Sequence, residues 1–414
     1  MCCKAAGRQF MQTLLKKGWL KMDFQKCRVF LPAMVLSAVI ILSVHIEKSG
    51  AAEWIITPEM SVTGTYDDNL LFEDVSDYEL RASPGLRANM TGERTRLEVA
   101  GKVDVLSYLD YSEFDRVNQD YTLQSEYDLN PRTTLKMGGR LRFDYTFETE
   151  LEEAGIVSEK SRRSYYTFLP GISVALDERN SLALDLFYAS TDNRRDERAD
   201  SWSTGGDLVW SRMFLDEQTF FLAGAGVEHV DFESRRVEGT HDIYRGIVGV
   251  SRDMGERYNV LLRGGPTWTH SRFDRNDERR RDDDLGFFID SRLLWQITER
   301  TSTDVGIDHG QYQSIYAENI TRNRIRAGLR HRFTEKWSGN ATGSFINSRT
   351  TGLVSREKRN TWQTGLSATY NLRPDMYFDL GYRYRHTRDR VDSTSKDGNR
   401  FFLQFTIRFP KQLN

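Results

Sequence analysis

Residues 97–109 read LEVAGKVDVLSYL, and this stretch decides the fold. Leu97, Val99 and Val103 alternate with Glu98 and Lys102, so one face is apolar and the other carries charges of both signs. A period of two places successive side chains on opposite faces of an extended strand. The stretch therefore predicts a β-strand with one face in an apolar medium and the other in water.

The same period of two recurs after residue 53, with apolar faces at 135–145, 325–333 and 401–409. In the second of these, Ile325, Leu329 and Phe333 alternate with arginines on the other face. No segment after residue 53 shows the 3.6-residue period of a convincing amphipathic helix. We therefore expect an all-β chain.

The connections between these strands fall into two kinds that alternate along the chain. Short turns are expected at 92–95, 130–133, 177–180, 216–218, 253–257, 298–300, 334–336 and 373–375. Longer, more charged loops lie between them, most plainly at 67–77, 148–160, 192–200, 272–284 and 388–399. Short turns at one rim and long loops at the other are typical of outer-membrane barrels. The pattern predicts a transmembrane antiparallel up-and-down β-barrel of about 18 strands. Sixteen is the alternative, because the first strand, near 54–65, has the weakest pattern.

The composition excludes several other classes. A helical membrane protein needs about 20 mostly apolar residues for each span, and only residues 29–44 come close. The net charge of -2 attracts no nucleic acid, and the 23 Phe, 18 Tyr and 8 Trp argue against disorder. A soluble β-sandwich is the main rival, but it turns every 8 to 12 residues or so. The strands here suit the roughly 9 to 11 residues that cross a bilayer.

Aromatic residues gather near the predicted strand ends, as in the interface belts of membrane barrels. Trp210, Trp295, Trp337 and Tyr377 lie beside short turns, and Tyr188, Trp202, Trp268 and Trp362 lie toward the longer loops. The alternative is that aromatic residues simply favour strands.

Residues 1–52 are expected to be a signal peptide with a long n-region, and residues 53–414 the outer-membrane β-barrel. An apolar core at 29–44 follows basic residues, and the small residues at 49–52 suit cleavage before the barrel. An uncleaved anchor is the alternative, because the apolar core is slightly long. The three cysteines, Cys2, Cys3 and Cys27, all lie in this segment, so we expect no thiol chemistry in the mature chain.

The segment Thr65-Tyr66-Asp67-Asp68-Asn69-Leu70-Leu71-Phe72 resembles the opening Tyr-(Asn/Asp)-Asp-Asn-(Ile/Leu) segment of one barrel family. This is the putative outer-membrane β-barrel porin 2 family, which includes barrels associated with exopolysaccharide and PEP-CTERM exosortase loci. The family's pattern of amphipathic strands covers residues 53–414. The resemblance implies the outer membrane of a Gram-negative cell and a porin-like role, with polysaccharide export as one form of it. It supplies no catalytic residues.

The strand pattern also predicts what faces the interior. If Ile325 and Leu329 face lipid, the arginines between them face inward, because an arginine toward lipid at the midplane costs about 2 to 4 kcal/mol. The same parity predicts a lumenal basic wall of Arg292, Arg324, Arg326, Arg330, Arg332, Arg383, Arg385 and Arg408. Such a wall favours anionic solutes such as acidic sugars, since arginine binds carboxylates through two N–H groups. The alternative is that Asp290, Asp304, Asp308 and Asp379 pair with the arginines and only stabilise the wall.

The run 277–284, DERRRDDD, lies on a predicted surface loop and balances its own charge. We expect a solvated loop tip there, with lipopolysaccharide or Ca²⁺ binding as the alternative.

These features favour a porin-like channel or exporter for small or oligomeric solutes, because barrels of 16 to 18 strands usually enclose water. The alternative is a structural or surface-binding barrel of the outer membrane without open-pore transport. The chain has no His-Glu-x-x-His, no Gly-x-Ser-x-Gly and no phosphate-binding glycine-rich loop. We therefore expect no enzyme activity, no metal and no cofactor. The expected partners are outer-membrane lipid and lipopolysaccharide, the barrel insertion machinery and polysaccharide export components, and no nucleic acid.

Overall fold

The computed structural model describes residues 52–72, 74–145, 162–194, 199–233, 238–255, 257–275, 278–313, 319–350, 358–391 and 393–413. The expected signal peptide, apart from its last residue, lies outside the described residues, and so does the predicted loop at 148–160.

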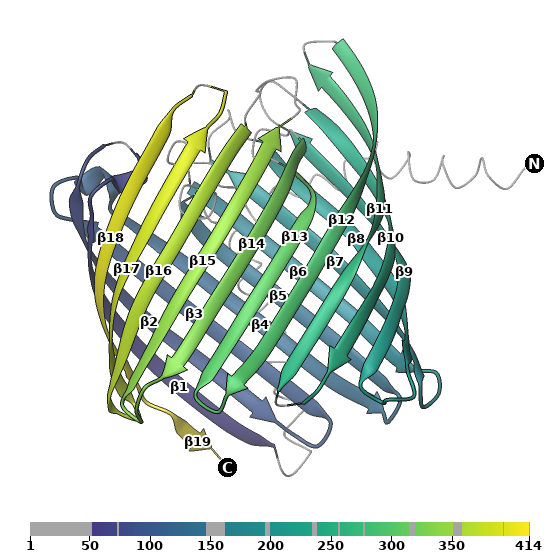
Figure 1. Cartoon of the computed structure of the whole chain (residues 1–414), viewed down its shortest axis with the longest axis horizontal. Coiled ribbons are helices and arrows are strands. Elements are labelled where there is room, and N and C mark those ends of the chain that lie inside the picture. Colours follow the sequence, from purple (N-terminus) through teal and green to yellow (C-terminus); the bar gives the residue numbers. More distant parts are fainter. Residues whose placement is uncertain are drawn as a thin grey trace, which may run out of the picture. The chain divides into compact units, whose positions relative to one another are not determined.

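Within the described ranges, eighteen long antiparallel strands close into a barrel (Figure 1). The strands of the first half are β1 Glu53–Asp67, β2 Asp77–Thr91, β3 Thr95–Tyr108, β4 Arg116–Asn130, β5 Thr133–Tyr145, β6 Arg162–Ala175, β7 Asn180–Asn193, β8 Asp200–Met213 and β9 Thr219–Glu233. Those of the second half are β10 Glu238–Asp253, β11 Tyr258–Arg275, β12 Glu278–Thr298, β13 Thr301–Gln313, β14 Asn319–Arg332, β15 Trp337–Thr350, β16 Lys358–Arg373, β17 Met376–Asp389 and β18 Ser395–Arg408. Each strand pairs with its neighbours in sequence, and β1 pairs with β18 to close the cylinder.

The expectation of 18 strands is confirmed, and the alternative of 16 is wrong. The first strand, which has the weakest alternation in the sequence, pairs over its whole length with β2, from Glu53 opposite Thr91 to Asp67 opposite Asp77. Short turns join the strands at one rim, as between Thr91 and Thr95, where the Gly92 N–H donates to the Thr95 carbonyl at 2.8 Å. Two short 3-10 turns, η1 Leu70–Phe72 and η2 Ser112–Phe114, lie in loops at the other rim. No helix among the described residues is long and apolar enough to span a membrane.

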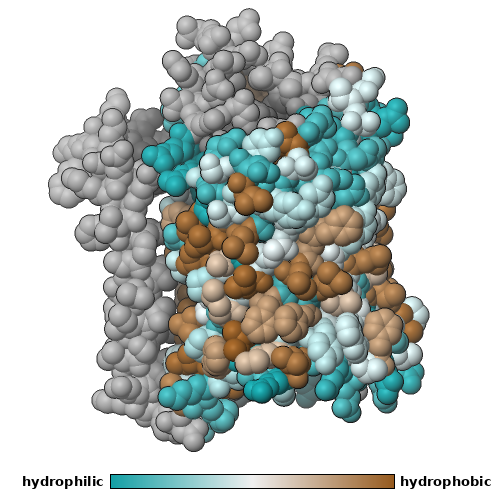
Figure 2. Space-filling view, turned by 90° about the vertical axis from the view of Figure 1, so that its left-hand side faces the viewer, coloured by the Kyte–Doolittle hydropathy of each residue, from teal (hydrophilic) through white to brown (hydrophobic). Residues whose placement is uncertain are grey.

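On the face that Figure 2 shows, the outer surface of the barrel carries an apolar band between two polar ends. The side chains of this band alternate along each strand with inward-facing polar ones. Leu80 on β2 and Leu366 on β16 are 59% and 61% exposed, whereas Glu79 and Thr361, on the interior faces of the same two strands, are buried. Large apolar side chains stay outside because hydrocarbon, not water, surrounds this part of an outer-membrane barrel.

Two predicted loops are wrong in extent. The segment 272–284 is not a loop, because β11 and β12 continue as a paired hairpin in which Ser271 lies opposite Asp282. Residues 276–277 lie outside the described residues. Likewise, the loop predicted at 388–399 is shorter, since β18 begins at Ser395. Strands that rise above the bilayer meet water on both faces, so their sequence loses its alternation although the hydrogen-bonded ladder goes on.

Two further findings depart from the sequence interpretation. Tyr377 does not belong to an outer aromatic belt, because it faces the interior and accepts a hydrogen bond from Arg408 at 2.8 Å. After Phe409, a short strand, β19 Lys411–Leu413, pairs with β1, with Leu413 opposite Trp54. The barrel seam therefore continues beyond the strand in which the apolar alternation ends.

Candidate functional site

Cross-strand pairing shows on which face of the barrel wall each of the eight predicted arginines lies. Directly paired residues project from the same side of a sheet, and that side alternates along each strand. Ile325 and Leu329 are outward and 49% and 43% exposed, so Arg324, Arg326 and Arg330 face inward. The registers from β12 round to β1 place Arg292, Arg332, Arg383, Arg385 and Arg408 on the same interior face.

Arg324, Arg385 and Arg408 form ion pairs with carboxylates on other strands. The Nε atom of Arg324 lies 2.6 Å from Asp308, and Arg385 Nη2 lies 3.1 Å from Asp67. Arg408 Nε lies 2.6 Å from Glu59 at the short-turn rim. These three arginines agree with the alternative in which carboxylates pair with the arginines and stabilise the wall, rather than with a wall of unpaired cations.

Four arginines stand apart from these pairs: Arg292, Arg326, Arg330 and Arg332. All four are exposed on the interior face, and within the described ranges their guanidinium groups form no ion pair. The residues opposite them are small or uncharged, since Arg326 pairs with Gly306 on one side and Ser344 on the other. Arg383 on β17 is also exposed on this face. The site thus divides into paired and unpaired cations.

The four predicted aspartates behave differently from one another. Asp308 forms ion pairs with both Arg324 and Arg322, the latter at 3.4 Å. Asp290 pairs with Arg263 at 2.7 Å, which is on β11 and was not in the predicted set. Asp379 accepts a hydrogen bond from the Thr369 hydroxyl at 2.5 Å. Asp304 is exposed and pairs with no cation among the described residues.

Elsewhere on the interior wall, several charged side chains form ion pairs with one another. On β4 to β6, Asp120 pairs with Arg140 and Arg142, and Asp144 pairs with Arg163 at 2.9 Å. On β8 to β10, Arg245 lies 2.9 Å from Asp207 and 3.4 Å from Glu228. Opposite charges in contact cancel over a short distance, so they add little to the field in the lumen. The unpaired arginines on β12 and β14 therefore make the wall unequal in charge around its circumference.

The mouth on the long-loop side is narrowed by the β1–β2 connection, whose described residues are 68–72 and 74–76. Leu70 is 4% exposed and packs against Leu106 and Tyr108, both on the interior face of β3. Phe72 is 3% exposed, and the Arg385 guanidinium lies 5.4 Å from the centre of its ring. The connection therefore folds into the barrel rather than away from it.

Polar contacts hold this connection to the adjacent strand β18. Asn69 Nδ2 donates to the Asp397 carbonyl at 2.5 Å, and Lys396 Nζ donates to the Phe72 carbonyl at 2.5 Å. Asp68 accepts hydrogen bonds from the backbone and side chain of Asn399 at 2.6 and 2.7 Å. The sequence segment Thr65–Phe72 was noticed as a family motif, but nothing in its pattern revealed this inward course.

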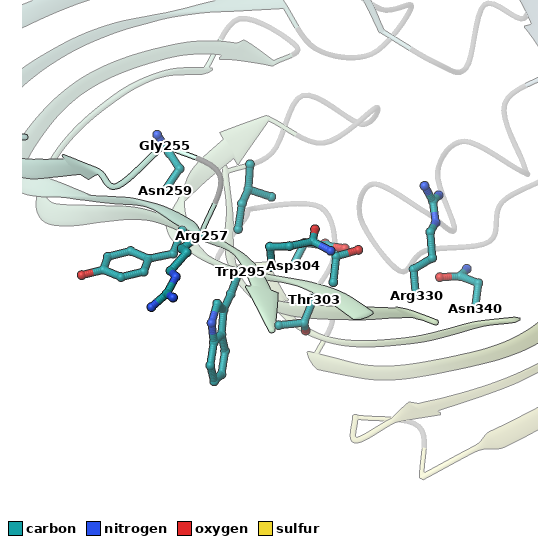
Figure 3. A pocket seen from close by; sticks show the side chains of 12 residues that line it. Gly255, Arg257, Asn259, Trp295, Thr303, Asp304, Arg330 and Asn340 are labelled. Atoms are coloured by element: carbon teal, nitrogen blue, oxygen red, sulfur yellow. The ribbon is translucent and has the colours of Figure 1, made fainter. Parts of the chain in front are cut away.

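A recess of about 340 Å³ lies at the short-turn rim, between the β10–β11 turn and strands β12 to β15 (Figure 3). Asp304, Arg330 and Asn340 project into the open side in Figure 3, whereas Trp295 points to the opposite side of the wall. The residues that line the recess are Gly255, Arg257, Tyr258, Asn259, Leu294, Trp295, Gln296, Ser302, Thr303, Asp304, Arg330 and Asn340. Sequence reasoning identified Arg330 but not its neighbours, which depend on the register of four strands.

No group of three or more His, Cys, Asp or Glu in the part of the chain that the structure describes is arranged to hold a metal ion. Three histidines instead lie opposite aspartates on neighbouring strands, namely His229 with Asp242, His270 with Asp283 and His386 with Asp397.

Comparison with known proteins decides the family. The sequence pattern of the family described as putative beta-barrel porin 2 matches residues 49–185 and 244–409. The chain belongs to this family. As a member of the porin 2 family, this barrel is a porin-like protein of the outer membrane. No curated protein matches the chain.

Several solved structures resemble this porin 2 barrel in general fold. The ferric citrate transporter FecA is 9% identical, with a TM-score of 0.47, over 86% of this chain and 78% of that one. The alcaligin receptor FauA from Bordetella pertussis is 8% identical, with a TM-score of 0.41, over 85% and 76%. OccK2 from Pseudomonas aeruginosa, solved with glucuronate, is 12% identical, with a TM-score of 0.43, over 86% and 98%. At these identities and scores the likeness concerns only the general fold.

Proposed function

We propose that this outer-membrane porin-like barrel conducts anionic solutes, and that acidic sugars and their oligomers are the chemical class it favours. Passage of an acidic polysaccharide segment is one form of this activity. The observation that carries the proposal is the set of four exposed interior arginines that form no ion pair with any described residue, Arg292, Arg326, Arg330 and Arg332.

The arrangement of these arginines supports an anion preference for two reasons. Their charges are not cancelled by contact with a carboxylate, so they act over about one Debye length, roughly 8 Å at physiological salt. Small neighbours such as Gly306 and Ser344 leave the guanidinium of Arg326 accessible to a solute. A guanidinium offers two parallel N–H groups to a carboxylate, which favours sugar acids over chloride.

A second candidate function rests on the inward-folded β1–β2 connection. Leu70 and Phe72 are buried in the long-loop mouth, which is what a structural or surface-binding barrel with a closed pore would need. The two candidates differ in conductance, because a closed barrel carries no steady current.

The proposal is tested by measuring the reversal potential of the purified protein in planar bilayers under a KCl gradient. We expect a steady conductance with preference for chloride, and liposome swelling that is faster with galacturonate than with galactose. Replacing Arg326 and Arg330 by Gln is expected to reduce the anion-to-cation permeability ratio several-fold, because two uncancelled charges are removed.

The matched control removes an ion pair from the same lumen without changing its net charge. Arg96 on β3 lies 2.8 Å from Glu126 on β4, so the double variant Arg96→Gln with Glu126→Gln should leave the permeability ratio unchanged. A cation-selective channel, or an anion preference that persists without Arg326 and Arg330, would refute the proposal. Absence of any conductance would favour the structural barrel.

A further inference from the structure

The recess at the short-turn rim contains hydrogen-bonding groups that form no hydrogen bond with the part of the chain that the structure describes. Arg330 lies directly opposite Ser302 on β13 and Asn340 on β15, so three polar side chains meet in one row. Asp304 lies one inward position away from Ser302, opposite Gly328. Among the described residues, neither Arg330 nor Asp304 forms an ion pair, although both line the same recess. A cation and an anion are thus held near each other with space between them.

The base of the recess adds apolar surface and two further amides. Leu294 lies opposite Asp304 on one side and Asn259 on the other, and it is 37% exposed. Gln296 lies opposite Ser302 and uses its Nε2 atom to donate to the Thr298 carbonyl at 2.6 Å, which leaves its oxygen as an acceptor. In Figure 3 the Arg257 side chain points to the same side of the wall as Trp295. On the interior side, the lining therefore offers the Arg330 guanidinium, the Asp304 carboxylate, amides and a small apolar patch.

This combination of groups discriminates between kinds of anion. Sulfate has no hydroxyl hydrogen to give to Asp304 and inorganic phosphate has only one or two, and the negative charges of both ions are repelled by that carboxylate. A sugar acid has one carboxylate for Arg330, hydroxyl groups that can donate to Asp304 and Asn340, and a C–H face that can pack on Leu294. The volume of about 340 Å³ lies at the small end of ordinary ligand sites, which span about 300 to 1,000 Å³. One or two sugar rings suit that volume.

The position of the recess indicates from which side of the membrane a ligand would reach it. It lies beside the β10–β11 and β12–β13 turns, at the rim of short turns, which faces the periplasm in outer-membrane barrels. Solutes that enter from the periplasmic side therefore reach the recess before the rest of the lumen.

We propose that the recess formed by Asn259, Leu294, Gln296, Asp304, Arg330 and Asn340 is a binding site for a single acidic sugar unit presented from the periplasmic side. The inference rests on the proposed anion conduction and deepens it, because it assigns a saturable site with one ligand class to one end of the channel. Arg330 binds the carboxylate, and Asp304 and Asn340 bind the hydroxyl groups.

The test is block of the channel current by trigalacturonate, added to one side of a planar bilayer at a time. The side of the short turns is identified by the current step on reaction of an engineered Glu335→Cys with a bulky charged maleimide. We expect half-block at about tenfold lower concentration from the short-turn side, and we expect Asn340→Ala to raise that concentration about tenfold through loss of one hydrogen-bonding group. Neutral galactose oligomers should block weakly from either side.

The variant Asp304→Asn decides between a sugar site and a simple attraction of anions. It removes a negative charge, so an electrostatic trap would bind every anion more tightly. A sugar site instead loses a hydroxyl acceptor, and we expect about tenfold weaker block by trigalacturonate while block by inorganic phosphate strengthens. The control is Asp185→Asn on β7, an exposed interior carboxylate on a distant wall, which should leave the block unchanged.

The two proposals fail in different ways in the same bilayers. The reversal potential reports on anion conduction, whereas the sidedness of the block and its response to Asn340→Ala and Asp304→Asn report on the recess. Anion preference with equal block from both sides, or tighter trigalacturonate block in Asp304→Asn, overturns the recess proposal alone. Sided, variant-sensitive block in a channel without anion preference overturns the proposed function.

Discussion

Arg385 on β17 reaches across β18 to Asp67 on β1, with its Nη2 atom 3.1 Å from Asp67 Oδ2. Gly398 lies between them on β18, opposite Arg385, and has no side chain to obstruct the contact. Asn69 and Phe72 cover this glycine, at 3.7 Å from the position that a Cβ would take. The pair therefore joins the closing strands of the barrel to the connection that folds into its mouth.

Loss of the Asp67 carboxylate is expected to destabilise the barrel and widen its mouth. The Arg385 and Asp67 side chains are only 10% and 6% exposed, so Asp67→Ala removes the carboxylate of a buried ion pair, at a cost of about 3 to 5 kcal/mol. The released connection should also raise single-channel conductance. Urea unfolding followed by gel mobility, together with conductance, measures both effects. In the control, Glu59→Ala removes a pair whose Arg408 is 47% exposed, and it should cost at most about 1 kcal/mol. Equal costs for the two variants would contradict the assignment.

Two adjacent residues on β16 should respond in opposite ways to the same substitution. Leu366 is 61% exposed on the outer band, and Ser367 faces the interior opposite Asn340. Leu366→Arg places a guanidinium in hydrocarbon and should cost about 2 to 4 kcal/mol, whereas Ser367→Arg should fold normally. Folding yield into lipid vesicles, read from heat-dependent gel migration, makes the comparison. If Ser367→Arg proves the more harmful of the two, the inward and outward faces are assigned the wrong way round.

The β6–β7 turn provides a pH-dependent stabilisation. Asp177 accepts hydrogen bonds from the backbone N–H groups of Arg179 and Asn180, both at 2.8 Å, and these hold the pKa of its carboxyl below the ordinary value of 3.8. Because the folded pKa is the lower one, the contribution is present above the ordinary value and is lost as the pH falls through the folded pKa. Asp177→Asn should therefore unfold faster than the unmodified chain at about pH 7 and equally fast near pH 2. The rate of urea unfolding at the two pH values checks this, and an equal difference at both would show that the carboxylate has no such role.

Much of the barrel could be predicted because the bilayer imposes a simple rule on the sequence. Leu97 and Val99 had to face away from Glu98 and Lys102, and the parity of a whole strand follows from that contrast. The rule ends where the bilayer ends, which is why Asp282 and Asp283 were placed in a loop although they lie in β12. Tyr377 illustrates a different limit, since an amphipathic ring suits both an interface and a polar lumen.

The partners of the interior charges could not be predicted, because a register shift of two residues preserves every inward and outward face. Asp290 and Asp308 were equally good candidates for the arginines of β12 and β14, yet Asp290 pairs with Arg263 of β11. The inward course of the β1–β2 connection was equally hidden. It depends on left-handed backbone conformations at Phe72 and Asp74, with φ of 61° and 58°. Phenylalanine does not signal this conformation, and aspartate, although enriched in it, adopts it too rarely to predict it.

The pairing of β1 with β18 and β19 sets the order in which the cylinder can be assembled. Hairpins of consecutive strands join residues close in sequence, but Thr63 and Gln404, which share a hydrogen bond at the seam, are 341 positions apart. Such distant partners meet slowly, so closure is expected to be the last and slowest event of folding. Until it occurs the sheet has two unpaired edges that invite other strands, and the added pairs of β19 with Trp54 to Ile56 lengthen the seam that removes them.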